Sequence, residues 1–151
     1  MASQWTDELA GLRRVAFDAN ALIYFLDGRD PYRGQVVEVL RMLEDGRAVG
    51  FLSTVVEMEL LVRPLRTHDT EAVERIETLL RLTPNLFVRP VARAVARAAA
   101  EVRAATGLRT PDAIIAASAI LDGCDVIIGN DRDFARHVRG VRYVCLDDFA
   151  A

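Results

Sequence analysis

Short apolar runs alternate with longer helical segments along this chain, and this alternation leaves few folds open to it. We predict buried strands at residues 14–17, 49–52, 86–89, 125–128 and 142–146. We predict helices at residues 20–26, 32–45, 55–62, 70–82, 91–106 and 111–121, with Pro64 ending the third of them. Strands that are separated by helices form a mainly parallel sheet with both faces covered. The sequence therefore predicts an α/β fold with a central, mainly parallel sheet of about five strands.

Length, charge and cysteine content narrow the class of protein. The 151 residues correspond to one domain, residues 1–151. A net charge of -3, from 19 basic and 22 acidic residues, argues against a platform that holds nucleic acid by bulk positive charge, but does not exclude a nucleic-acid enzyme. Cys124 and Cys145 form no CxxC pair and indicate a reducing compartment. Because we find neither a membrane-spanning stretch nor a leader pattern, we expect a soluble, cytoplasmic protein.

Carboxylate and amide side chains directly follow two of the predicted strands. Asp18 and Asn20 follow the first strand, and Asp131 and Asp133 follow the fourth. In open α/β sheets, ligands bind beyond the carboxyl ends of the strands, which makes these residues candidates for a functional site. A structural explanation is also open, because Asp and Asn are preferred N-caps of helices.

Asp112 is a third candidate. Thr110 and Pro111 have the pattern of a helix start, with Thr as the N-cap and Pro at the first helical position, which puts Asp112 in the first turn. The helix dipole favours a carboxylate there without any function. Residues 113–117, however, are apolar on nearly every side of the helix. We therefore expect this helix to lie deep in the fold, with Asp112 partly buried near the edge of the sheet.

The fourth candidate is one of two glutamates in the helix predicted at residues 55–62. Glu57 fits a capping box with Thr54, in which the Glu side chain bonds to the N-cap amide. Glu59 lies about 200° further around the helix, among apolar neighbours. A carboxylate buried there needs a partner. We therefore assign the cap to Glu57 and the functional site to Glu59.

Three or four carboxylates in one crevice repel each other, and the chain contains no lysine to offset them. A divalent cation resolves this repulsion, and ligation by carboxylates alone matches Mg²⁺ or Mn²⁺ rather than zinc. His68 and His137 show no ligand spacing. The chain also has no GxSxG elbow, no P-loop and no GxGxxG motif. These patterns favour metal-dependent chemistry on the four carboxylates.

Four segments together resemble the PIN-domain nucleases, and within them the VapC-like toxin ribonucleases of type II toxin–antitoxin pairs. They are VAFDAN at 15–20, LSTVVEMELL at 52–61, TPDAIIAA at 110–117 and GNDRDF at 129–134. The resemblance extends over residues 15–149. It implies that the acidic quartet of the family falls on Asp18, Glu59, Asp112 and Asp131, with Asn20 and Asp133 as supporting residues.

The sequence departs from the family pattern at two positions. Gly129 stands where the family usually has a small hydroxyl residue, which is expected to weaken the positioning of substrate or water. Arg63 stands where glycine is common, without an expected consequence for the chemistry.

The resemblance implies an endoribonuclease that uses Mg²⁺ or Mn²⁺ to hydrolyse RNA phosphodiester bonds, as the toxin component of such a pair. Asp18 and Asp112 would be the direct metal ligands, and Glu59 and Asp131 would bind through water or orient the nucleophile. The implied partners are the RNA substrate, a small cognate antitoxin that covers the acidic crevice with an inserted arginine, and a second copy of the chain, without a membrane. The alternative is a PIN-like module that binds RNA or a partner protein without cleavage.

Overall fold

The computed structural model describes residues 3–150, which form a five-stranded parallel sheet with helices on both faces. The strands are β1 (Arg14–Phe17), β2 (Val49–Ser53), β3 (Leu86–Arg89), β4 (Val126–Gly129) and β5 (Arg142–Cys145). Their order in the sheet is β3-β2-β1-β4-β5, and every neighbouring pair is parallel. The predicted α/β fold class is confirmed, and each predicted strand is found with its bounds correct to within one residue.

The helices are α1 (Gln4–Leu9), α2 (Ala19–Leu26), α3 (Tyr32–Glu44), α4 (Thr54–Arg66), α5 (Thr70–Leu82), α6 (Arg93–Thr106), α7 (Thr110–Leu121) and α8 (Arg132–His137), and a 3-10 turn spans Leu146–Phe149. Helices α1 and α8 and the 3-10 turn were not predicted, because such short segments carry too little periodicity. Among residues 3–150, no helix is both long enough and apolar enough to span a membrane.

Pro64 does not end α4, contrary to the prediction. Proline lacks the N–H that would bond to the carbonyl one turn earlier, but its fixed φ is compatible with a helix. The next turn closes in spite of the missing bond, since the Thr67 amide donates to the Arg63 carbonyl at 3.0 Å. Helix α4 therefore continues through Pro64 to Arg66.

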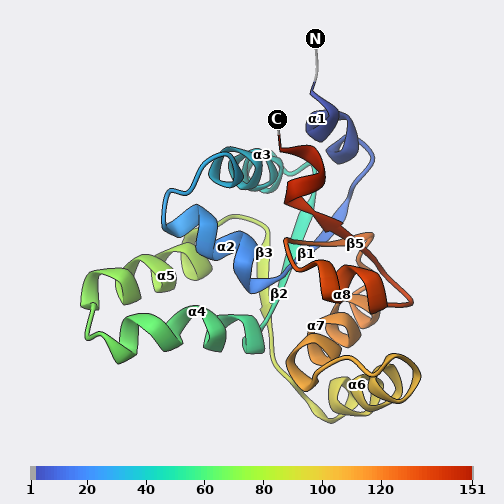
Figure 1. Cartoon of the computed structure of the whole chain (residues 1–151). Helices are drawn as coiled ribbons and strands as arrows, with labels where there is room; N and C mark the ends of the chain where they lie inside the picture. Colours follow the sequence, from blue (N-terminus) through green and yellow to red (C-terminus); the bar gives the residue numbers. More distant parts are fainter. Residues whose placement is uncertain (1–2, 151) are drawn as a thin grey trace.

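The direction of the chain connections places the helices in two layers. From β1 to β3 the chain moves toward one edge of the sheet, and after β3 it returns to the other side of β1 to form β4 and β5. Right-handed crossovers that run in opposite directions put their helices on opposite faces. Figure 1 shows α2, α3 and α5 on one side of the sheet and α6, α7 and α8 on the other.

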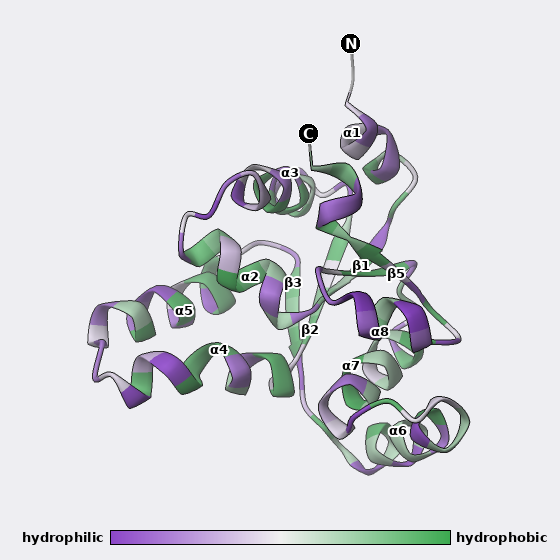
Figure 2. Ribbon diagram, in the orientation of Figure 1, coloured by the Kyte–Doolittle hydropathy of each residue, from purple (hydrophilic) through white to green (hydrophobic). Residues whose placement is uncertain are grey.

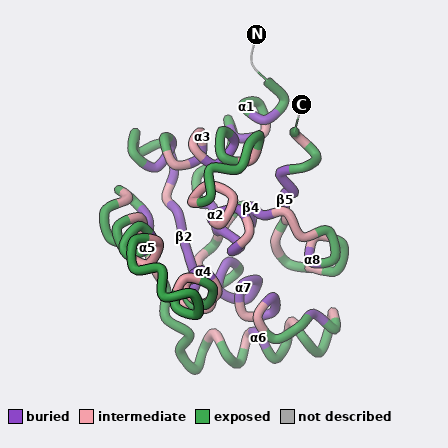
Figure 3. The backbone as a smooth tube through the Cα atoms, turned by 60° about the vertical axis from the view of Figure 1, so that its left-hand side comes forward, coloured by how far each residue is buried: buried purple, intermediate pink, exposed green. Residues whose placement is uncertain are grey.

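The central strands and α7 form the most deeply buried part of the molecule. Val126, Ile127 and Ile128 of β4 have no exposed surface. Figure 2 shows the apolar character of the strands, and Figure 3 shows that buried residues are concentrated in the sheet and α7, whereas α6 is mostly exposed. The predicted deep position of the 113–117 segment is confirmed, because five of the six residues Asp112–Ala117 are buried.

The strand order reverses between β1 and β4, which are neighbours in the sheet although far apart in the sequence. In open parallel sheets, ligands bind at this switch point, beyond the carboxyl ends of the strands. Asp18 directly follows β1 and Asp131 closely follows β4. The fold thus brings these two segments to one place.

Candidate functional site

Asp18 lies between β1 and α2 and uses both of its carboxylate oxygens. It is the N-cap of α2, and its Oδ1 accepts a hydrogen bond from the Ala19 amide at 2.8 Å. Its Oδ2 accepts a hydrogen bond from the Tyr143 hydroxyl at 2.7 Å. Burial raises the pKa of Asp18 to about 6, because it outweighs these two hydrogen bonds, which lower the pKa; the charges of Asp112 and Asp131 raise it further by smaller amounts. Asp18 can therefore cap α2 and also serve as a residue of the functional site.

Asp112 lies in the first turn of α7 and is 6% exposed. The Arg109 guanidinium donates to its Oδ2 from Nε at 3.3 Å and from Nη2 at 3.2 Å. Burial nevertheless raises the pKa of Asp112, because desolvation outweighs the effect of this arginine. The prediction that Thr110 caps the helix is wrong: Thr110 is the first helical residue, and the N-cap position is taken by Arg109 without a side-chain cap.

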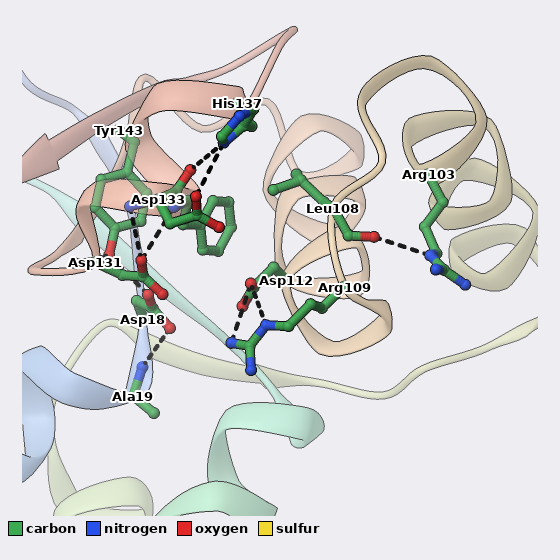
Figure 4. Close-up of polar contacts among 11 residues, drawn as sticks. Asp18, Ala19, Arg103, Leu108, Arg109, Asp112, Asp131, Asp133, His137 and Tyr143 are labelled. Carbon is green, nitrogen blue, oxygen red and sulfur yellow. Dashed lines mark hydrogen bonds and ion pairs between the residues drawn. The ribbon is translucent and has the colours of Figure 1, made fainter.

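Asp131 is the N-cap of α8, and its Oδ1 accepts hydrogen bonds from the amides of Asp133 and Phe134, each at 3.0 Å. Its own amide donates to the Tyr143 hydroxyl at 3.1 Å. Figure 4 shows the carboxylates of Asp18 and Asp131 close together, with Asp112 facing them across a gap and the Arg109 guanidinium beside Asp112. The three aspartates of the predicted quartet therefore converge from three separate elements.

Glu59 lies on α4, close enough to two of the aspartates for their charges to act on it. Its pKa is raised first by partial burial and then by the charges of Asp18 and Asp112. The same side chain also lines a pocket with Ile23 of α2 and Ile76 of α5. The capping box predicted for Glu57 is wrong, because Ser53 at the end of β2 is the N-cap and its Oγ accepts from the Val55 amide at 3.2 Å. In a capping box the glutamate stands three residues after the N-cap, whereas Glu57 stands four residues after Ser53.

The two predicted supporting residues have different surroundings. Asn20 Oδ1 accepts a hydrogen bond from the Asn130 amide at 3.0 Å, which ties the start of α2 to the loop after β4. The exposed Asp133 side chain instead lies 3.4 Å from His137 Nδ1, one turn further along α8. Asn20 thus holds the loop that carries Asp131, whereas Asp133 contacts His137 (Figure 4), and its charge contributes to the raised pKa of Asp112.

Two residues that contact the aspartates were not found from the sequence, Tyr143 and Arg109. Tyr143 lies in β5, and tyrosine is common in strands. The only feature of the sequence that could have indicated its role is Gly129, which has no side chain to fill the space that Tyr143 enters. Arg109 stands three residues before Asp112, a spacing at which helical side chains meet, but the pattern Thr110-Pro111 had suggested a later helix start. The absence of lysine had implied uncompensated carboxylates, whereas Arg109 partly offsets Asp112.

The donor set fits a hard divalent cation. All candidate donors are carboxylate oxygens, and Asp18 and Asp112 are almost fully buried, where a cation would offset their repulsion. As they stand, no three His, Cys, Asp or Glu residues within the described part of the chain are arranged to hold a metal ion. Arg109 donates to Oδ2 of Asp112, so a cation could bind this carboxylate through both of its oxygens only if the guanidinium moved away.

Comparisons with known proteins identify the family of the chain. Residues 15–140 match the PIN domain. The chain belongs to the PIN domain family. No curated protein sequence matches it significantly.

Several solved structures have the same fold. VapBC2 from Rickettsia felis, bound to a promoter DNA fragment, matches with a TM-score of 0.69 at 14% identity, covering 87% of this chain and 98% of that one. VapC20 from Mycobacterium tuberculosis, a toxin that cleaves the sarcin-ricin loop, matches with a TM-score of 0.64 at 20% identity, covering 85% and 98%. FitAcB from Neisseria gonorrhoeae matches with a TM-score of 0.62 at 18% identity, covering 85% and 95%.

Protonation of Asp18 links the stability of this PIN domain to pH. The pKa of the Asp18 carboxyl rises from 3.8 to about 6 on folding. As pH rises from about 4 to about 6, the unfolded chain therefore loses the Asp18 proton before the folded chain does, and the free energy of unfolding falls. This change corresponds to about 3 kcal/mol. We expect the free energy of unfolding of metal-free Asp18→Asn, minus that of the wild type, to increase by up to this amount between pH 4 and 7. Denaturant titrations at several pH values measure it, and a difference that does not vary with pH would contradict the environment described for Asp18.

Proposed function

We propose that this PIN protein is a Mg²⁺- or Mn²⁺-dependent endoribonuclease, the toxin component of a type II toxin–antitoxin pair. The observation that carries the proposal is the convergence of Asp18, Asp112 and Asp131 at the switch point of the sheet, with burial raising the pKa of the first two. The similarity of the fold to VapC and Fit proteins supports a nuclease of the toxin class.

The residues of the site have distinct roles in this proposal. Asp18 and Asp112 would hold the cation directly, and Glu59 and Asp131 would bind it through water or orient the attacking water. When bound, such a cation would supply a coordinated water of lowered pKa and stabilisation of the charge in the in-line transition state. Arg109, whose side chain is 73% exposed at the rim, can turn from Asp112 to a phosphate oxygen of the RNA.

An assay of purified protein with structured RNAs tests the proposal. We expect cleavage in Mn²⁺ or Mg²⁺ and its loss in EDTA, with recovery when excess cation is restored. Binding of RNA that needs no metal, without cleavage under any of these conditions, would contradict the nuclease and favour the alternative of a PIN-like module that binds RNA or a partner protein.

The similarity to VapBC complexes supports an antitoxin partner. We propose a small antitoxin that covers the carboxylates and sets an arginine beside them, as Arg109 does within this chain. We also propose that the protein forms a homodimer. A measurement of its mass in solution tests this. The two cysteines are free, in line with the proposed cytoplasmic location.

A further inference from the structure

The end of β4 has room for the Tyr143 hydroxyl only because residue 129 is glycine. A Cβ added to Gly129 would overlap that hydroxyl, and it would come within 2.8 Å of Tyr143 Cζ and 2.7 Å of Asp18 Cβ. Cβ atoms in proteins essentially never come this close to other heavy atoms. Gly129 therefore leaves a gap between β1 and β5, and the tip of Tyr143 fills it.

The Tyr143 hydroxyl connects two of the candidate ligands. It donates to Asp18 Oδ2 at 2.7 Å and accepts from the Asp131 amide at 3.1 Å, so its single proton and one of its lone pairs are both used. The ring itself is held by β5, which pairs with β4, and by the buried Phe134 ring, whose centroid is 4.8 Å away. This hydroxyl is thus a fixed bridge between the segments that follow β1 and β4.

We propose that Tyr143 is a positioning residue of the cation site, and that Gly129 and Tyr143 act as a pair, in which the glycine leaves the space that the tyrosine hydroxyl fills. With the Ala19 amide on Oδ1 and Tyr143 on Oδ2, the Asp18 carboxylate has one orientation before any cation arrives. Hydrogen bonds of this kind to ligand side chains commonly account for 10–100-fold in metal affinity or activity. The inference rests on the proposed function, because it assigns Tyr143 to the same carboxylate site.

A purely structural role for Tyr143 is the competing explanation, and metal affinity separates the two. Tyr143→Phe removes the hydroxyl and keeps the ring. Tyr32→Phe is the matched control, because the Tyr32 hydroxyl also donates to an aspartate, Asp147, which is not one of the four carboxylates. We measure the Kd for Mn²⁺ by electron paramagnetic resonance of the free ion, and kcat and KM for a cleaved RNA.

For Tyr143→Phe we expect a Kd for Mn²⁺ about tenfold weaker and a kcat at least about tenfold lower, with KM for RNA nearly unchanged. Tyr32→Phe should match the wild type in all three values. A Tyr143→Phe protein that melts at a lower temperature but keeps the wild-type Kd and kcat would overturn the proposal and leave Tyr143 with a structural role only.

A second pair of variants tests whether Gly129 serves Tyr143. Gly129→Ala should lower the melting temperature by less in a Tyr143→Val background than in the wild type, because two of the three close approaches are to Tyr143. An equal drop in both backgrounds would overturn the pairing. If Gly129→Ala does not fold in the wild-type background but folds with Tyr143→Val, the pairing is supported.

The wild type and Asp112→Asn serve as reference proteins, which distinguish failure of this inference from failure of the proposed function. If the wild type binds no Mn²⁺, the cation site itself is wrong, and this inference falls with it. If the wild type binds Mn²⁺, Asp112→Asn does not, and Tyr143→Phe equals the wild type, only the role of Tyr143 is wrong.

Discussion

Asp112→Asn should remove the response of the protein to Mn²⁺ and reduce RNA cleavage by about 100-fold or more, the scale on which single groups stabilise transition-state charge. A cation that binds only the folded state stabilises it by RT ln(1 + [L]/Kd), about 2.7 kcal/mol at 100 times Kd. For a domain of this size, that is a rise in melting temperature of roughly 5–10 °C. We expect this rise in the wild type and its near absence in the variant.

The metal-free variant should melt at or above the wild-type temperature. Burial raises the pKa of Asp112 in spite of the Arg109 guanidinium, so the charge on this carboxylate destabilises the fold on balance. Asparagine has nearly the same shape and carries no charge. Differential scanning fluorimetry with and without Mn²⁺ measures both effects.

Asp125→Asn is the matched control for Asp112→Asn. Asp125 lies before β4, at the other end of the sheet, where its Oδ2 accepts from the amides of Arg13 and Arg14 at 2.8 and 2.9 Å. These bonds lower the pKa of Asp125, so removing its charge should lower the melting temperature and leave the Mn²⁺ response intact. A metal-free Asp112→Asn protein that behaves like this control would show that Asp112 is only a structural residue.

Glu59→Gln should reduce cleavage by about 100-fold, whereas Glu57→Gln should change it by less than about twofold. The two glutamates share one helix, and the pKa of Glu59 is raised by burial and by the charges of Asp18 and Asp112. Initial rates on one RNA substrate at saturating Mn²⁺ give the comparison. Circular dichroism checks that both variants keep the fold.

The two glutamate variants also test the direction in which α4 faces. Because Ser53 rather than Thr54 caps α4, Glu57→Gln removes no capping bond, and we expect its melting temperature to stay close to that of the wild type. Equal losses of activity in the two variants would mean that the assigned face of α4 is wrong.

Short-range patterns in the sequence were sufficient for the strands, most of the helices and three of the candidate positions. Asp18, Asp131 and Asp112 each stand at an element boundary that neighbouring residues define, through an apolar run or a proline at a helix start. Such boundaries depend on residues within a few positions, so they can be read without knowing the fold. Errors arose where the local pattern allowed two answers, as for the caps of α4 and α7 and for Pro64.

The contacts between distant segments required the folded structure. Each apolar run is compatible with any place in a parallel sheet, so the sequence does not say that β1 pairs with β4, and that pairing is what brings Asp18 and Asp131 together. Tyr143 reaches Asp18 across 125 residues of sequence, through a space that exists because β4 ends in a glycine. The contact between Tyr143 and Asp18 depends on strand order and on the volume left by the missing side chain at Gly129, and both of these are properties of the packed molecule.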